Sequence, residues 1–187
     1  MAIFDDLRAQ YSVWDERHKQ YRFASMQFVF KLASEFTSYI GAPITYLDFR
    51  DKSTKRYIEP LQAVRDDEGN IHYKEAMTPI DAITHDKDGY WISGIKLVLD
   101  HGDKTYPKSS FHIPIRFMLR ENQCELKIGT DNDGRFEFDL SDPNNFKPAF
   151  DYMVLLLNGV LELKPWSTIG KSPIGFTMPQ PETGNGK

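Results

Sequence analysis

The sequence predicts an α+β fold, in which a long N-terminal helix and a C-terminal helix pack on one face of an antiparallel β-meander of about six strands. The first 40 residues contain no proline or glycine, and their large apolar residues recur at three- and four-residue steps. Between residues 90 and 140, short runs of alternating apolar and polar residues are separated by turns rich in Asp, Asn and Gly. A second helical pattern follows at residues 146–163 and ends before Pro165.

The first helix is expected to continue to residue 40, where Gly41 and Pro43 stop it. At about 1.5 Å per residue it would be roughly 55 Å long, which exceeds the diameter of a compact domain of this size. From Phe23 onward apolar groups spread almost all round the helix, so we expect this half to pack on the sheet. Before Phe23 the apolar stripe is narrower and charged residues are denser, which is typical of a seam between two helices.

The strands follow in order along the chain. The first is expected at residues 44–49, a second at 57–65 with a break at Pro60, and a third at 71–76. Residues 78–84 fit either a short helix or a strand. The meander proper is expected at 90–99, 111–119, 124–128 and 135–140.

Alternation along these strands predicts which side faces the core. Phe111, Ile113 and Ile115 share one face of their strand, while His112 and Arg116 share the other. The strand at 90–99 is apolar on both sides, so we expect it to be covered on both, and a helix lying across it would account for this.

Three segments are therefore predicted. Residues 1–40 form the long helix, whose front half is an oligomerisation or docking arm. Residues 44–164 form one globular domain together with the back of that helix. Residues 165–187, rich in Pro, Gly, Ser and Thr, form an extended tail with one apolar cluster at 174–178.

Composition limits the class of protein. A net charge of −4 argues against bulk attraction to nucleic acid or to an anionic membrane. The single cysteine, Cys124, lies in an alternating apolar stretch, which favours a small buried side chain and a reducing compartment. We find no signal-peptide pattern and no apolar run long enough for a membrane span, so we expect a cytoplasmic protein with no membrane association.

The motifs of common enzymes are missing. Gly170, Lys171 and Ser172 match only the end of a phosphate-binding loop, because Pro165 stands where the first glycine is needed and Pro173 follows Ser172. We find no pattern of metalloprotease, redox or dinucleotide-binding type, and the sequence indicates no cofactor. These observations favour a protein without catalytic function, although dispersed catalytic groups would leave no motif.

Two alternatives remain from the sequence. Asp100, His101 and His112 flank one connection and would suit a small metal-assisted hydrolase if they met at one end of the sheet; histidines on the surface of a hairpin are the plainer interpretation. The outer sheet face carries cations that could follow a nucleic-acid backbone, chiefly Lys96, Arg116 and Arg120. Acidic residues lie among them, which favours cross-strand ion pairs and argues against nucleic acid as a partner.

The leading hypothesis is a non-catalytic binding or assembly subunit, which joins a homo-oligomer or a larger complex through its aromatic helix. Aromatic side chains are favoured at protein interfaces. The expected contacts on the partner or on a second copy come from the front of the helix and from the tail: Phe4, Leu7, Tyr11, Trp14, His18, Tyr21, Ile174 and Phe176.

Overall fold

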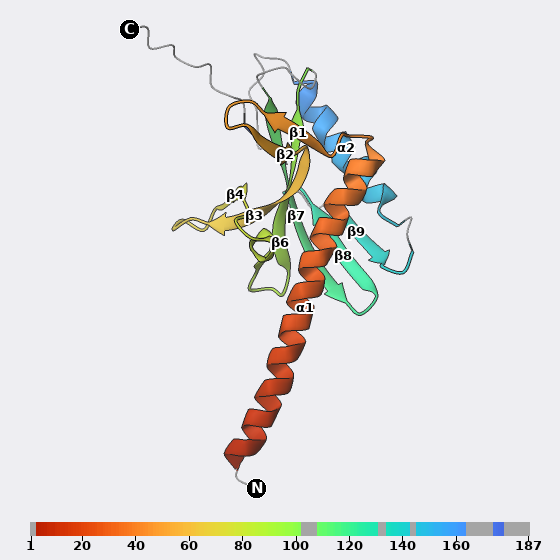
Figure 1. Ribbon diagram of the computed structural model, residues 1–187. Helices are drawn as coiled ribbons and strands as arrows, with labels where there is room; N and C mark the ends of the chain where they lie inside the picture. The colour runs from red at the N-terminus through yellow and green to blue at the C-terminus, as the bar shows by residue number, and fades with distance from the viewer. Residues whose placement is uncertain (1–2, 102–107, 131–133, 143–144, 164–173, 178–187) are drawn as a thin grey trace, which may run out of the picture.

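The computed structural model describes residues 3–101, 108–130, 134–142, 145–163 and 174–177. Figure 1 shows one long helix, α1 (Ile3–Tyr39), which crosses the sheet and extends far beyond it at its N-terminal end. A second helix, α2 (Lys147–Leu161), packs beside the back half of α1. The α+β class is confirmed, with both helices on one face of a mostly antiparallel sheet.

Within the residues that the structure describes, the main sheet contains eight strands. Six of them follow the order β4-β3-β6-β7-β8-β9, and each pairs antiparallel with its neighbours. Two short strands are added at the sides, where β5 pairs with β6 and β10 pairs with β7. The bounds are β3 (Ile58–Arg65), β4 (Ile71–Glu75), β5 (Thr84–His85), β6 (Trp91–Leu99), β7 (Ser109–Arg120), β8 (Gln123–Ile128), β9 (Arg135–Asp139) and β10 (Gly175–Thr177).

A separate two-stranded hairpin precedes this sheet. It consists of β1 (Thr45–Asp48) and β2 (Ser53–Arg56), with Tyr46 opposite Lys55. Tyr57 follows β2 directly, and its ring lies 4.9 Å from that of Tyr46 between ring centroids. Sequence analysis predicted the first strand of this hairpin at residues 44–49, but predicted no strand where β2 lies.

The core lies between the two helices and one face of the sheet. The register places Ile95 of β6 opposite Ile113 of β7, and both side chains are fully buried. Phe28 of α1 contacts Phe117 of β7, with 4.8 Å between ring centroids. Phe36 of α1 contacts Phe150 of α2 at 5.4 Å. The helices therefore share one apolar layer with the inward residues of the sheet, as the alternation predicted.

The opposite face of β6 is covered by a tyrosine, not by the helix that the sequence suggested. Tyr73 of β4 lies against Gly94, where an added Cβ atom would stand 2.6 Å from the ring. This close approach explains why a glycine occupies the middle of a central strand. Ile92 and Val98, on the same face as Gly94, are also buried.

Strand β3 runs through Pro60 without a break, so the predicted interruption is wrong. Pro60 lies opposite Ile95 of β6, and β3 pairs with β6 only as far as Leu61. From Leu61 onward it pairs with β4. A proline is tolerated in a strand where its nitrogen is not needed for the ladder.

The segment at 78–84 proves to be both of the predicted alternatives in succession. A short 3₁₀ helix, η1 (Pro79–Ala82), is followed by β5. Asp81 accepts hydrogen bonds from the backbone nitrogen of Thr78 at 3.0 Å and from its hydroxyl at 2.7 Å. These contacts stabilise the first turn of η1, and the fixed φ angle of Pro79 suits the first position of a helix.

Candidate interaction surface

The front of α1 forms an arm, residues 3–20, that contributes nothing to the core. Its large apolar side chains remain exposed: Phe4 is 67% exposed, Leu7 56%, Tyr11 63% and Trp14 53%. At about 1.5 Å per residue the arm is roughly 27 Å long. Figure 1 shows it standing free of the sheet.

The exposed residues of the arm continue the face by which α1 packs on the sheet. We use the term stripe for the set Phe4, Leu7, Tyr11, Trp14, His18 and Tyr21, whose spacing alternates between three and four residues. The same alternation continues through Ser25, Phe28 and Leu32, which are all buried. At about 3.6 residues per turn the two sets point the same way to within a few tens of degrees. The stripe therefore has the orientation of a docking face but lies past the end of the sheet.

The boundary between the arm and the docked half falls at Tyr21. Its ring lies 5.9 Å from that of Trp91 at the start of β6, and Tyr21 is only partly exposed. Ser25, one turn further, is completely buried. The stripe thus enters the core at its last member.

Phe23 was expected to pack on the sheet, and the structure shows that this expectation is wrong. Its side chain is 54% exposed. Phe23 precedes Phe28 by five residues, which turns it to the opposite side of the helix. The core therefore begins at Ser25, and Phe23 belongs to the outer surface of α1.

Contacts within the arm order the stripe. The Trp14 ring lies 5.8 Å from Tyr11 and 3.9 Å from His18, measured between ring centroids. Nδ1 of His18 lies 2.8 Å from the carbonyl oxygen of Trp14. On the flank of the stripe, Lys19 forms an ion pair with Asp15 at 2.6 Å. The three central rings consequently form one continuous surface, which limits the side-chain entropy lost on binding.

The two tail residues have different positions. Ile174 is buried in the core cluster of this chain, so it offers no surface to a partner. Phe176 lies in β10, opposite Phe111 of β7. The remainder of the predicted tail lies outside the described residues, and only 174–177 are placed. The interaction surface that we carry forward consists of the stripe alone.

The residues of the metal-site alternative have other contacts. Asp100 accepts a hydrogen bond from the Tyr57 hydroxyl at 2.9 Å and forms an ion pair with Lys108. His112 lies opposite Lys96 in the register, and its Nε2 is 3.0 Å from the Ser110 hydroxyl. His101 is exposed. Among the residues that the structure describes, no three His, Cys, Asp or Glu side chains are grouped so as to hold a metal ion.

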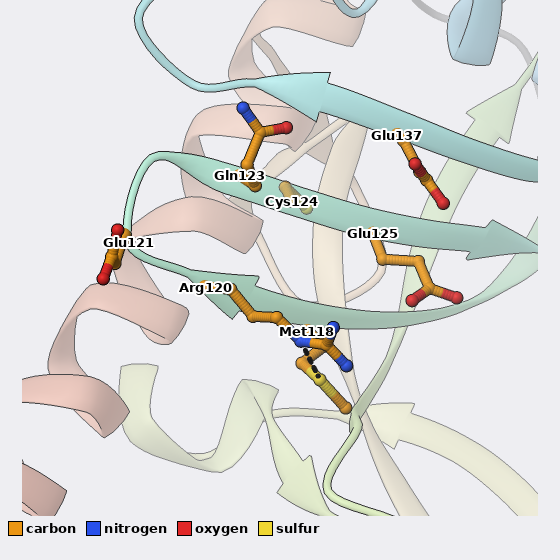
Figure 2. A pocket seen from close by; sticks show the side chains of 7 residues that line it. All are labelled: Met118, Arg120, Glu121, Gln123, Cys124, Glu125 and Glu137. Atoms are coloured by element: carbon orange, nitrogen blue, oxygen red, sulfur yellow. Dashed lines mark hydrogen bonds between the residues drawn. The ribbon is translucent and has the colours of Figure 1, made fainter.

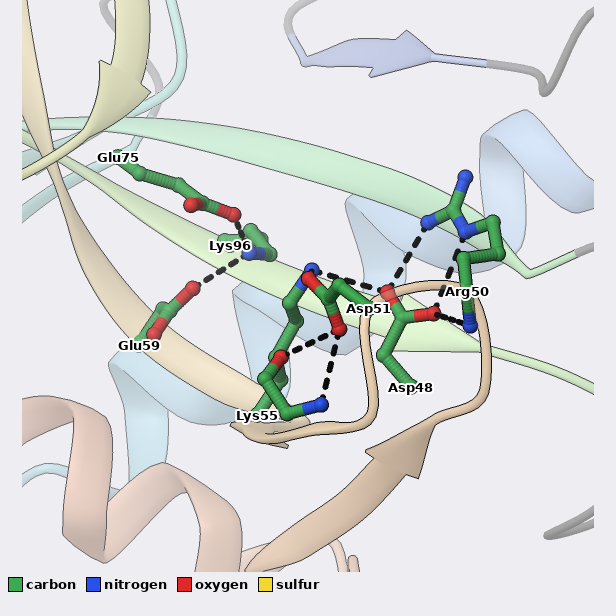
Figure 3. Close-up of polar contacts among 8 residues, drawn as sticks. Asp48, Arg50, Asp51, Lys55, Glu59, Glu75 and Lys96 are labelled. Carbon is green, nitrogen blue, oxygen red and sulfur yellow. Dashed lines mark hydrogen bonds and ion pairs between the residues drawn. The ribbon is translucent and has the colours of Figure 1, made fainter.

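The outer sheet face carries paired charges, as Figure 3 shows for one end of it. Lys96, although nearly buried, lies between Glu59 and Glu75, with 2.7 Å to Glu75. Burial lowers the pKa of Lys96, but the two carboxylates outweigh this effect and the net pKa is raised. The hydrogen bond from Lys96 in turn lowers the pKa of Glu75.

A second ion-pair group lies at the β1–β2 hairpin. Asp48 is buried, and it accepts from Lys55 at 2.9 Å and from Arg50 at 3.1 Å. Lys55 also contacts Asp51, which has a pKa of about 2 chiefly because Ser53 and Lys55 donate hydrogen bonds to it. A cavity of about 320 Å³ lies between this hairpin and the outer face of the sheet. Sequence analysis missed this arrangement, because nothing local places the hairpin over that face.

The three candidate nucleic-acid contacts do not form a continuous positively charged surface. Arg116 forms ion pairs with Asp86 at 2.9 Å and with Asp88 at 2.6 Å. Nε of Arg120 lies 3.2 Å from the sulfur of Met118. With Lys96 paired as well, two of the three cations face carboxylates, and the cross-strand ion pairs expected from the mixed charges are present.

A cavity of about 440 Å³ lies where the β7–β8 turn meets β9 (Figure 2). Cys124 is next to it, but its thiol is buried, and burial raises its pKa to about 12. Glu125 accepts a hydrogen bond from the Tyr90 hydroxyl, which lowers the pKa of this carboxyl group. A protonated thiol and an engaged carboxylate do not make a nucleophile with its base.

In the described part of the chain, no helix combines the length and the apolar character that crossing a membrane requires. The aromatic stripe of α1 has charged residues on its flanks, including Arg8, Asp15 and Arg17. No protein-family model, no curated protein and no solved structure matches this chain.

Proposed function

We propose that this protein is a non-catalytic assembly subunit, which joins a homo-oligomer or a larger protein complex through the stripe of its N-terminal arm. One observation carries the proposal. Four large apolar side chains, Phe4, Leu7, Tyr11 and Trp14, are each more than half exposed on the face of α1 that packs on the core further along.

The free energy available from covering these side chains is large. Fully burying one side chain of this size contributes about 1.5–3 kcal/mol. Aromatic rings dominate the buried centres of protein interfaces, because they cover much area with few rotatable bonds. A partner that buries the stripe would therefore gain several such increments at once.

Helix stability supports the same proposal. Isolated helices shorter than about 12–15 residues are only marginally stable in water, and the arm, residues 3–20, is only slightly longer than this. Its flanks contribute the Asp15–Lys19 ion pair, which is worth only a few tenths of a kcal/mol. Packing the stripe against a partner would supply the tertiary contacts from which most helices gain their stability.

The test is the mass of the native particle that contains this chain. The chain, tagged and produced in its own cells, is expected to elute in a particle heavier than its monomer mass of 21.7 kDa. Replacing Leu7 and Trp14 together by Glu places two charges in the stripe and should release the monomer. Val13→Glu is the matched control, since Val13 is 52% exposed on the arm but lies on another side of the helix.

Two results would overturn the proposal. One is a monomer mass for the unaltered chain in fresh extract. The other is a particle of unchanged mass after the Leu7 and Trp14 substitutions. Circular dichroism of each purified variant would show that its domain is folded.

A further inference from the structure

We infer that the stripe is occupied by the stripe of a second copy of this chain, with the two arms antiparallel. This inference rests on the proposed function and names the partner. The alternating three- and four-residue spacing of the stripe is the heptad pattern by which two helices interlock their side chains. Apart from Ile3, Ala9 and Val13, the apolar residues of the arm fall at two positions of the heptad, which is the narrow seam of a helix pair.

An antiparallel pairing uses the full length of both arms. The register that places Phe4 opposite Tyr21 of the second copy also places Leu7 opposite His18 of the second copy. The central rings, Tyr11 and Trp14, then lie opposite each other twice across the two-fold axis. Every member of the stripe obtains a counterpart in this register.

The charges that flank the stripe select the antiparallel direction. In that register Arg8 lies beside Asp15 of the second copy, and the symmetry repeats this attraction. A parallel pairing would instead place Arg17 beside Arg22 of the second copy, twice over. Opposite charges at flanking positions favour one orientation, and like charges penalise the other.

The position of the globular domain fits the same register. The domain begins at Tyr21, where α1 first contacts β6. In the antiparallel pair Tyr21 faces Phe4 of the second copy, so each arm ends where the other domain begins. The arm and the gap between the two domains therefore have the same length.

The area of this interface sets the expected affinity. If each of the four exposed stripe residues covers about 100–150 Å², the two arms together bury roughly 1,000 Å². This lies at the lower end of specific interfaces. We therefore expect a reversible dimer with a Kd on the order of micromolar.

The first test is a concentration series of the purified full chain, followed by sedimentation or light scattering. The mass should rise from 21.7 kDa toward twice this value. Arg8→Glu and Asp15→Arg should each weaken the dimer, by about tenfold for two symmetric charge contacts. The double variant restores the opposite charges and should recover most of the affinity. Glu16→Arg, on the outer side of the arm, is the matched control and should have no such effect.

The second test is the direction of the pair, measured between spin labels on single added cysteines. Cys124 is buried and should remain unlabelled in the folded chain. In the antiparallel pair, labels at Asp5→Cys are offset by about 22 Å along the axis, and labels at Ser12→Cys by about 2 Å. The Asp5 distance should therefore exceed the Ser12 distance by about 10 Å.

The results of these tests distinguish a failure of the antiparallel pairing from a failure of the proposed function. Equal label distances at the two positions would overturn the antiparallel pairing. A purified chain that stays monomeric at high concentration, while its native particle is heavier, would overturn self-pairing and leave the proposed function standing. A monomer under both conditions would overturn both.

Discussion

The two halves of α1 share one apolar face but differ in the residues beside it. In the back half this face is widened by Val29 and Phe36, and both are buried. At the equivalent heptad positions the front half of α1 has Arg8, Asp15 and Arg22. A wide face suits a sheet, whereas a narrow seam with charged flanks suits another helix. The width of an apolar stripe, more than its presence, thus indicates the kind of surface that it contacts.

The largest expected effect is a difference between the two halves of α1 in how much each contributes to the free energy of unfolding of the domain. Leu32→Ala removes a fully buried side chain from the back half and should reduce the free energy of unfolding by about 2–5 kcal/mol. Leu7→Ala makes the same chemical change in the arm and should alter domain stability by less than about 0.5 kcal/mol. Urea denaturation at a dilution where the chain is monomeric would measure both. Similar losses for the two variants would show that the arm does pack on the domain.

A second prediction concerns the contribution of His18 in the stripe to self-association. His18 has the most polar side chain of the stripe, whose other members are apolar or are aromatic rings with a single polar group. A polar side chain in the seam between two helices lowers the affinity of the pair. His18→Leu should tighten self-association by about tenfold, which corresponds to about 1.4 kcal/mol. Sedimentation over a concentration series would detect the change. A weaker dimer would indicate that the His18 ring, with its contacts to Trp14, is needed in the seam.

A smaller effect is expected at the point where the stripe enters the core. The Ser25 hydroxyl is buried and has no hydrogen-bond partner among the residues that the structure describes. Ser25→Ala removes this unsatisfied group and improves helix propensity, so the domain should become more stable by about 0.5–1 kcal/mol. Thermal and urea unfolding would measure this gain. A loss of stability would point to a buried water bonded to Ser25.

The smallest effect compares a partly buried histidine, His112, with an exposed one, His101. Burial, and then the charge of Lys96, lowers the pKa of His112. The unfolded chain therefore binds a proton at this position more readily than the folded domain, and stability should fall as the pH drops below about 6.5. His112→Gln should remove part of this loss, whereas the exposed His101→Gln should not. Urea midpoints between pH 7.5 and 5.5 would test the difference, to which the nearby Glu75 contributes little because the hydrogen bond from Lys96 lowers the pKa of its carboxyl group and keeps it ionised in this range.

Much of the fold follows from local pattern. The long helix, the six central strands and the second helix were predicted, because apolar periodicity and turn residues define them. The change of partner within β3 at Leu61, and the addition of β10 beside β7, were not predicted. Both depend on pairings between residues far apart in sequence, which no local pattern encodes.

The exposure of the candidate interaction surface was also predicted correctly in one part and wrongly in another. The exposed arm was predicted from the length of the helix, since roughly 55 Å of helix cannot be covered by a domain of this size, and from the narrow apolar stripe with dense charges before Phe23. The errors came from local composition. Phe23 was assigned to the core because of the apolar residues around it, although its phase on the helix turns it outward. Ile174 was assigned to a partner because the residues around it are typical of a free tail.

The side strands β5 and β10 affect how this protein can aggregate. A central strand with an open side offers backbone groups to any foreign strand. Here β5 pairs with β6 beside the point where β3 departs, and β10 pairs with β7 beyond the end of β8. In the described part of the chain, the outermost strands β4 and β9 are short and carry charged side chains such as Lys74 and Glu137. Growth by strand addition is thus discouraged at both margins of the sheet, and the sheet itself is protected from fibre formation.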